Sequence, residues 1–178
     1  CNMSTHGGGW TLVARTIKAG LTNGEKTTIR SSTWAVHATD GYGDPSSESR
    51  IYWMPLNQWH LITAAHDDSE FWSDTSATDV RVTNYNVDNE ASKFRQSWSN
   101  TVGGYNGFIG NLNGARFTTK DSDNDTWGAN CSKDNIGLNG GFWYTNCYQL
   151  SMLHSNGNVY SLHNNVDTSV SYNHIYLR

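Results

Sequence analysis

Three short stretches of the chain have hydrophobic patterns that predict β-strands. Trp10 to Arg15 is a mostly hydrophobic run that directly follows a turn of three glycines. Val80 and Val82 alternate with polar neighbours, as in a strand with one buried face. The closing residues His174 to Leu177 also read as a strand. Strand patterns therefore lie near both ends of the chain and close to its middle.

One segment carries the pattern of a short helix. Pro55 stands where a proline is tolerated in the first helical turn. The hydrophobic residues that follow fall roughly on one helix face; they are Leu56, Trp59, Leu61 and Ile62. We therefore predict a helix that begins at Pro55 and runs for about two turns.

The remaining segments show little periodicity. Residues 20–50 contain Gly, Ser, Thr and Asp without a sustained period and are predicted to form loops. Ala91–Trp98 fits a weak helix or a strand equally well, and little regular structure is expected from Val102 to the closing strand. No repeat or linker is visible, so we expect one domain over residues 1–178 with a loop-built lobe at 118–170.

The composition requires a folded, loop-rich protein. The chain has 178 residues, with 17 Gly but only 2 Pro, and its wealth of turn-forming polar residues argues against a helical bundle. It also contains 8 Trp, 9 Tyr and 5 Phe. Each aromatic side chain can bury about 150–250 Å². A substantial core is therefore available, which excludes global disorder.

The charge balance restricts the classes of partner. Only 16% of the residues are charged and the formal net charge is −4, so a basic surface for nucleic acid or anionic lipid is not expected. The uncharged stretches are too short and too polar for a membrane-spanning helix, so no membrane insertion is expected. Few charges, many tryptophans and a pair of cysteines favour a secreted protein.

Alternating aspartates form the sharpest local motif, Asp121 to Asp125. Carboxylates separated by single residues, with backbone carbonyls between them, suit Ca²⁺, which takes 6–8 oxygen ligands. The loop is not an EF-hand, because Thr126 replaces the required sixth-position glycine and Ser132 replaces the twelfth-position glutamate. The motif predicts a calcium loop of another kind, and the alternative is an acidic turn exposed to solvent.

Cysteines flank the segment that follows this motif. A bridge between Cys131 and Cys147 would stabilise the fold by about 3 kcal/mol in the chain-entropy model, and the alternative is two buried free thiols. The aromatic run Phe142 to Tyr144 would then lie near the calcium loop. These rings fit either a sugar-binding pocket or the core of the lobe.

Catalytic motifs are weak in this sequence. It contains no Gly-x-Ser-x-Gly, His-Glu-x-x-His or phosphate-binding loop. The run His66 to Asp68 is a candidate acid–base cluster, but such exposed runs are usually solvated turns. His154 and His163 fit either ligand contacts or a solvated loop. We therefore expect no enzyme activity.

Taken in order, these motifs resemble the fibrinogen C-terminal domain family, which includes domains of fibrinogen, ficolins, tachylectins and angiopoietins. The resemblance covers most of the chain, and the two ends are also similar to intelectins. The matching runs are Cys1–Thr11, Gly41–Asp44, Tyr52–Trp53, His60–Thr63, Val102–Gly107, Asn113–Gly114, Phe117–Asp125, Asn130–Cys131, Gly140–Tyr144, Asn146–Cys147 and Asn156–Tyr160.

The resemblance implies an α+β fold: a twisted, mainly antiparallel sheet with a few short helices and a loop-rich calcium-binding lobe. It implies a Cys131–Cys147 disulfide. The family's calcium ligands fall on the carboxylates of Asp123 and Asp125 and on the carbonyls of Trp127 and Ala129.

In lectin members of the family, residues around the second cysteine form a pocket for acetylated sugars, with a cis peptide bond before that cysteine. The corresponding bond here is Asn146–Cys147, and Tyr148 stands where these lectins commonly have histidine. The family's later pocket tyrosines are absent from residues 161–167. The resemblance places the ligand-binding site on Asn146, Cys147, Tyr148, His163 and Asp167.

The resemblance implies a secreted, calcium-binding recognition module. The first hypothesis is a lectin of innate immunity that binds carbohydrate, and the alternative is a protein-binding domain of the angiopoietin or fibrinogen type. Cys1 matches a cysteine that normally pairs with one further upstream, in a family segment that this protein is expected to lack. It is therefore expected to stay free or to pair outside the chain, for example in a homo-oligomer.

Overall fold

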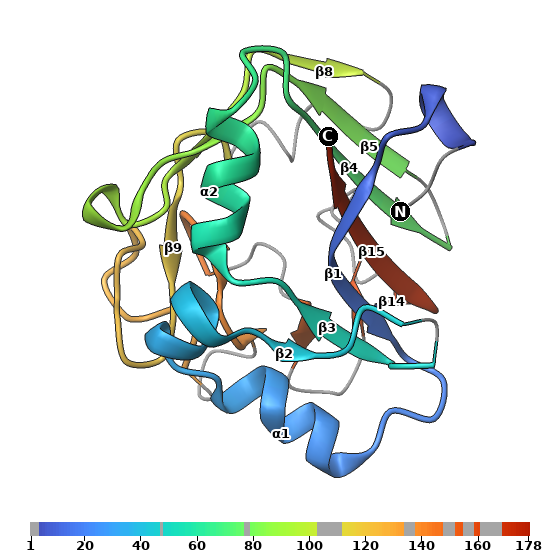
Figure 1. Ribbon diagram of the computed structural model, residues 1–178. Coiled ribbons are helices and arrows are strands. Elements are labelled where there is room, and N and C mark those ends of the chain that lie inside the picture. Colours follow the sequence, from blue (N-terminus) through green and yellow to red (C-terminus); the bar gives the residue numbers. More distant parts are fainter. Residues whose placement is uncertain are drawn as a thin grey trace.

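The fold is built on a seven-stranded antiparallel sheet. A computed structural model describes residues 4–46, 48–76, 79–102, 112–133, 138–147, 152–154, 159–160 and 169–178. The strand order is β2-β3-β1-β15-β4-β5-β8. These strands are β1 (Thr11–Ile17), β2 (Tyr42–Gly43), β3 (Ile51–Trp53), β4 (Glu70–Thr75), β5 (Asp79–Thr83), β8 (Asn100–Val102) and β15 (Tyr172–Leu177). The first and last strands lie side by side near the middle of the sheet (Figure 1).

All three predicted strands are confirmed as β1, β5 and β15. In β1 the consecutive residues Leu12, Val13 and Ala14 are all buried. In β15 buried and partly exposed side chains alternate, and Ile175 and Leu177 face the core. Val80 and Val82 are buried on β5 in the same way. The short 3-10 turn η1 (Thr5–Gly7) precedes β1.

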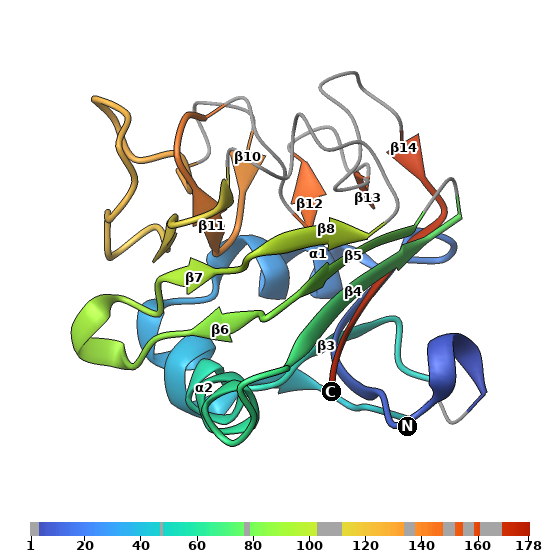
Figure 2. The ribbon, with the colours of Figure 1, turned by 90° about the horizontal axis from the view of Figure 1, so that it is seen from above.

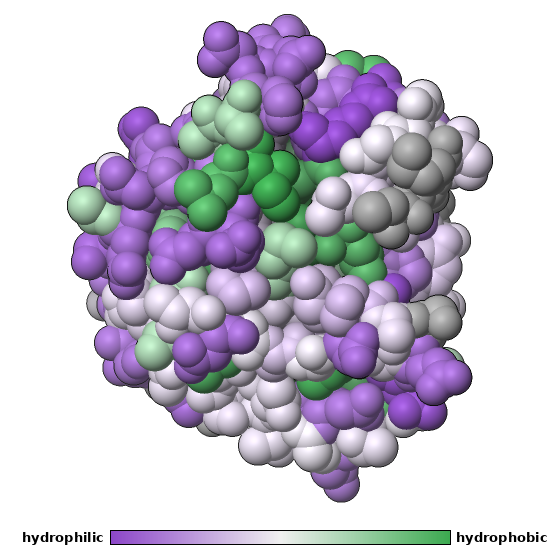
Figure 3. Space-filling view, viewed as in Figure 1, coloured by the Kyte–Doolittle hydropathy of each residue, from purple (hydrophilic) through white to green (hydrophobic). Residues whose placement is uncertain are grey.

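The predicted helix is confirmed as α2 (Leu56–Ala64), with Pro55 just before its first turn. Leu56, Trp59 and Thr63 form its buried face. Leu61 is 59% exposed, because five residues after Leu56 a helix has turned well past the buried face. Figure 3 shows hydrophobic side chains over α2 within a mainly hydrophilic surface.

The loop prediction for residues 20–50 is wrong in three places. Helix α1 (Asn23–Ser31), the π-helical turn η2 (Val36–Asp40) and strand β2 all lie there. The side chain of Thr22 accepts a hydrogen bond from the Glu25 backbone, and the Glu25 carboxylate accepts one from the Thr22 backbone. This capping box satisfies free N–H groups at the start of α1 and compensates for a weak hydrophobic pattern.

A lobe of short strands lies on one side of the sheet, away from the two chain ends (Figure 2). Strand β9 (Arg116–Thr118) pairs with β11 (Phe142–Tyr144), and we call the described residues of 116–147 the disulfide lobe. The other short elements are β6 (Asn86–Val87), η3 (Glu90–Ser92), β7 (Gln96–Ser97), β10 (Leu138–Asn139), β12 (Leu153–His154), β13 (Val159–Tyr160) and β14 (Ser169–Val170). Ala91–Trp98, whose period is ambiguous, holds the end of η3 and all of β7.

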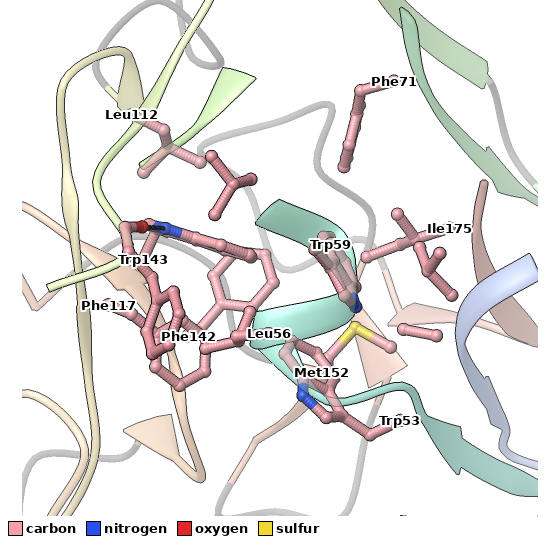
Figure 4. Close-up of a cluster of buried hydrophobic side chains, with 14 of the residues drawn as sticks. Trp53, Leu56, Trp59, Phe71, Leu112, Phe117, Phe142, Trp143, Met152 and Ile175 are labelled. Carbon is pink, nitrogen blue, oxygen red and sulfur yellow. Dashed lines mark hydrogen bonds between the residues drawn. The ribbon is translucent and has the colours of Figure 1, made fainter. Parts of the chain in front are cut away.

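Aromatic rings join the sheet, the helix and the disulfide lobe into one core (Figure 4). Trp53 of β3 lies 5.2 Å from Trp59 of α2, and Trp59 lies 5.4 Å from Trp143 of β11, measured between ring centroids. Phe117 of β9 meets Trp143 edge-on at 4.9 Å. Phe142, Trp143 and Tyr144 are all buried, so these rings form core rather than an exposed sugar platform.

Candidate functional site

A disulfide closes the base of the aspartate loop. Cys131 and Cys147 are bonded, with 4.7 Å between their Cα atoms, and both side chains are buried. The bridge that the resemblance implies is therefore present, which excludes two free thiols. It joins the residues that follow the aspartate motif to the end of the β11 segment.

Asn124 ties the aspartate motif to strand β9. Its side-chain amide donates to the Phe117 carbonyl at 2.8 Å and to Ser122 Oγ at 3.0 Å, and its backbone N–H donates to Thr118 Oγ1 at 3.1 Å. This bonding fixes the residue between Asp123 and Asp125. The two carboxylates therefore extend from a turn whose backbone is already ordered.

Asp125 is partly buried beside a second carboxylate. Its two oxygens accept hydrogen bonds from the backbone N–H groups of Trp127 and Cys131, each at 3.0 Å. Burial, and then the negative charge of Asp123, raise the pKa of Asp125 in spite of those two bonds. A bound cation would offset the repulsion between these two carboxylates, so the pair is a candidate cation site.

Asp121 has a different role from the other two aspartates. Its Oδ1 accepts from the Trp34 backbone N–H at 2.9 Å and from Thr119 Oγ1 at 2.7 Å. Burial acts to raise the pKa of Asp121, but these hydrogen bonds outweigh it, so the pKa is lowered. Asp121 thus connects the loop to the segment between α1 and η2.

The other side of the loop is bound to β11 and its neighbours. Thr126 donates to the Thr145 carbonyl through both its backbone N–H and its hydroxyl, at 3.2 and 2.7 Å. The Asn130 side chain donates to the Thr119 carbonyl at 2.9 Å. Ser132 Oγ donates to the Gly140 carbonyl at 2.7 Å. The loop is therefore held at both ends by side-chain to backbone bonds rather than by regular secondary structure.

The donor set of this loop fits calcium better than a transition metal. The residues with described positions contain no cluster of three or more His, Cys, Asp and Glu side chains that could hold a metal ion. Asp123 and Asp125 would hold the ion through carboxylates, and Trp127 and Ala129 through backbone carbonyls. These are hard oxygen donors on an exposed part of the loop, where Trp127 is 45% exposed.

The predicted ligand pocket is described only in part. Asn146 is exposed and Cys147 is buried beside it. Tyr148, His163 and Asp167 lie outside the described residues, as does Cys1. The expectation of a cis bond between Asn146 and Cys147 is wrong: this peptide bond is trans, as are the other peptide bonds of the described residues. Without proline, a cis bond costs about 3–4 kcal/mol.

The acid–base candidate lies elsewhere. The residues His66 to Asp68 follow α2 and are exposed. His66 and Asp68 line a hollow of about 770 Å³ together with Glu70 and Arg178. Arg178 is occupied, because its Nε donates to Glu70 at 2.7 Å and its Nη1 donates to the His6 carbonyl, also at 2.7 Å. This arrangement supplies no aligned nucleophile and base. No sequence motif marks this hollow, because Arg178 and Glu70 are far apart in the sequence and meet only through the pairing of β15 with β4.

The described helices include none that is long and apolar enough to cross a membrane.

Comparison with known proteins matches the sequence to one family. The profile of the C-terminal globular domain of the fibrinogen beta and gamma chains matches residues 1–175, which confirms the resemblance found in the motifs. Tenascin-R of Rattus norvegicus is 30% identical over 156 residues, which cover 85% of this chain and 10% of tenascin-R. Ryncolin-4 of Cerberus rynchops is 28% identical over 159 residues, covering 85% of this chain and 41% of ryncolin-4. The protein therefore spans less than half the length of either relative.

Solved structures show the same fold. The fibrinogen-like globe domain of human ANGPTL2 superposes with a TM-score of 0.77 at 17% identity, covering all of this chain and 83% of that domain. Lamprey fibrin D-dimer in complex with the peptide Gly-His-Arg-Pro-amide gives a TM-score of 0.69 at 16% identity, covering 97% of this chain and 62% of the lamprey chain. The α+β architecture is thus confirmed.

Proposed function

Because the protein belongs to the family of the C-terminal globular domains of fibrinogen beta and gamma chains, we propose that it is a secreted recognition module that binds calcium and carbohydrate. Calcium binds at the aspartate loop, through the carboxylates of Asp123 and Asp125 and the carbonyls of Trp127 and Ala129. Carbohydrate binds beside the Cys131–Cys147 disulfide. The similarity to tenascin-R and to a fibrinogen beta chain supports secretion, because these relatives are extracellular proteins.

The carboxylate pair carries this proposal. The negative charge of Asp123 disfavours ionisation of the partly buried Asp125, and both residues lie on a loop ordered by Asn124 and by the disulfide. Bound Ca²⁺ removes that repulsion, and it binds without the cost of ordering the loop. A site with two carboxylates is expected in the micromolar to millimolar affinity range, about 10⁻⁶ to 10⁻³ M.

The ligand pocket follows from the position of the disulfide. Asn146 is exposed directly before a buried, bridged cysteine, so its side chain is presented from a rigid backbone. In the proposal, Tyr148 stacks on a sugar face or an acetyl methyl group, while Asn146 and Asp167 supply hydrogen bonds. His163 makes the affinity sensitive to pH between about 5 and 8. A pre-ordered site of this kind loses little entropy on binding.

A peptide or protein ligand is the second candidate. This candidate is favoured by the lamprey fibrin D-dimer, a protein of the same fold whose solved structure is a complex with the peptide Gly-His-Arg-Pro-amide. Angiopoietin-4 of Bos taurus is also 29% identical over 157 residues, covering 83% of this chain and 28% of angiopoietin-4. Fibrinogen, tenascin and angiopoietin are non-enzymatic families, and we propose no catalytic activity for this protein either.

A glycan array with and without a calcium chelator tests the proposal. We expect binding to acetylated glycans that disappears with chelator and in Tyr148→Ala, whereas Tyr148→Ala keeps its calorimetric calcium binding. Trp98→Phe is a matched control, since this partly buried ring lies outside the disulfide lobe. Retained glycan binding by Tyr148→Ala would move the site elsewhere. No glycan binding at all, with intact calcium binding, would favour a peptide or protein ligand.

A further inference from the structure

His37 of η2 is buried at the contact between the sheet and the disulfide lobe. Its side chain is 1% exposed, and neither ring nitrogen has a hydrogen-bond partner among the described residues. Buried polar side chains are nearly always hydrogen-bonded, so a histidine with both nitrogens unpaired is unusual. This environment accepts the neutral ring far better than the charged one.

The ring is enclosed on both sides by apolar groups. On the sheet side it meets Trp53 of β3 and Tyr42 of β2, with ring centroids 4.9 and 5.7 Å away. On the lobe side Phe117 of β9 lies 5.1 Å away. A Cβ atom placed on Gly141 would come within 2.5 Å of His37 Nε2, so the ring packs directly on that glycine. His37 therefore packs against both the sheet and the lobe, beside the direct contact between Trp53 and Phe117.

Two titratable groups face this ring. Tyr42 is partly buried and burial raises its pKa, so it stays neutral throughout the acid range. Asp121 of the lobe attracts a charged His37, but its carboxylate accepts from Trp34 and Thr119 and makes no hydrogen bond to the ring. Burial dominates and lowers the pKa of His37 to about 3. The protonated ring is therefore stable only where water reaches it.

We propose that His37 makes the attachment of the disulfide lobe to the sheet sensitive to acid. Protonation of the ring favours a state in which the lobe has moved off and water has entered. The lobe is the side that opens, because among the described strands β9 and β11 pair only with each other over three residues, whereas β3 is part of the seven-stranded sheet. The inference does not depend on calcium or on carbohydrate binding.

Reduction of the Cys131–Cys147 disulfide measures this opening. Both cysteines are buried, so a water-soluble phosphine reaches the bridge only when the lobe opens. The rate is measured from pH 7.5 to 4.5 with chelator present, by alkylation and mass spectrometry, relative to a small model disulfide. A free-histidine pKa near 6.5 allows up to tenfold faster opening per pH unit well below it, or about 50-fold between pH 6.5 and 4.5.

His37→Phe, which cannot be protonated, is expected to lose most of this acceleration. His174→Phe is the matched control, because His174 is a partly buried histidine that lies on the sheet beside Asp74. It should keep the wild-type slope. Equal slopes in the wild type and in His37→Phe overturn the proposal. His37→Leu serves the same purpose if the phenylalanine variant does not fold.

Two measurements on the wild type locate the effect without any variant. Hydrogen exchange, corrected for its intrinsic pH dependence, is expected to rise in peptides from 116–133 and 138–147 before it rises in β4 and β15. Equal acceleration across the protein overturns the assignment to the lobe. In histidine-labelled protein, the His37 ring should stay neutral in the folded state down to pH 5. A folded-state titration near pH 6.5 also overturns the proposal.

Discussion

The seven-stranded sheet and the disulfide lobe are stabilised in different ways. In the sheet, β1 and β15 form a ladder of six paired positions, and alternate side chains are buried beneath it. In the lobe, β9 and β11 share only three paired positions. A disulfide and bonds from Asn124, Asn130 and Ser132 to backbone carbonyls supply the rest. The sheet depends on a repeating pattern, whereas the lobe depends on single residues.

This difference has a functional consequence. A repeating ladder tolerates the loss of one side chain, but it offers few irregular positions for a binding site. An irregular loop can direct carboxylates and carbonyls toward one point, but it needs specific bonds to hold its backbone. The two regions should therefore respond differently to the same kind of change.

The largest effect is expected at the core that the two regions share. Trp143 is fully buried and its indole donates to the Phe94 carbonyl at 2.6 Å. Trp143→Ala should lower the free energy of unfolding by about 3–5 kcal/mol in urea denaturation, because it removes a large buried ring. Trp143→Phe keeps an aromatic ring there and should cost less. A loss under about 1 kcal/mol for the alanine variant would mean that the lobe packs independently of α2.

Removing the disulfide should weaken the lobe more than the sheet. The double variant Cys131→Ser, Cys147→Ser should lose about 3 kcal/mol of stability, because the unfolded chain gains the freedom of an open loop. Hydrogen exchange should quicken in residues 138–147 while β15 stays protected. Equal loss of protection in both regions would contradict a separately stabilised lobe.

Calcium is expected to stabilise the lobe by a similar amount. At a free concentration about 100 times the dissociation constant, binding adds about 2.7 kcal/mol, so chelation should lower the melting temperature. Asp123→Asn should abolish this dependence, whereas Asp79→Asn, on the sheet, should keep it. Unchanged calorimetric calcium binding by Asp123→Asn would remove Asp123 from the site.

The smallest effect is expected outside both regions, at the start of α1. Thr22→Ala removes the side-chain acceptor for the Glu25 N–H and should cost about 1 kcal/mol by denaturant unfolding. Thr22→Ser keeps the hydroxyl and should be nearly neutral.

Glu25 also stabilises the start of α1. Hydrogen bonding to the Thr22 backbone lowers the pKa of Glu25, so this part of the stability disappears as the pH falls below about 4.

Local sequence patterns predict the elements whose hydrophobic side chains recur at a regular spacing. The strands β1, β5 and β15 and the helix α2 follow from hydrophobic spacing, since one face of each is buried. Helix α1 escapes prediction although its signal is present, because Thr22 and Glu25 form a capping box without a strong hydrophobic stripe. The family resemblance follows from the order of the motifs along the sequence.

The sequence by itself determined the core-forming periodicity, the family and the choice of aspartates and cysteines as candidate ligands and bridge. Only the tertiary structure decided which of these residues meet. It directed Asp121 to Trp34 rather than to Asp123, joined Arg178 to Glu70 across the sheet, and enclosed His37 between Trp53 and Phe117. Those contacts join residues that are far apart in the sequence. They depend on the pairing of distant strands and on packing in the core, which no single short segment of the sequence specifies by itself.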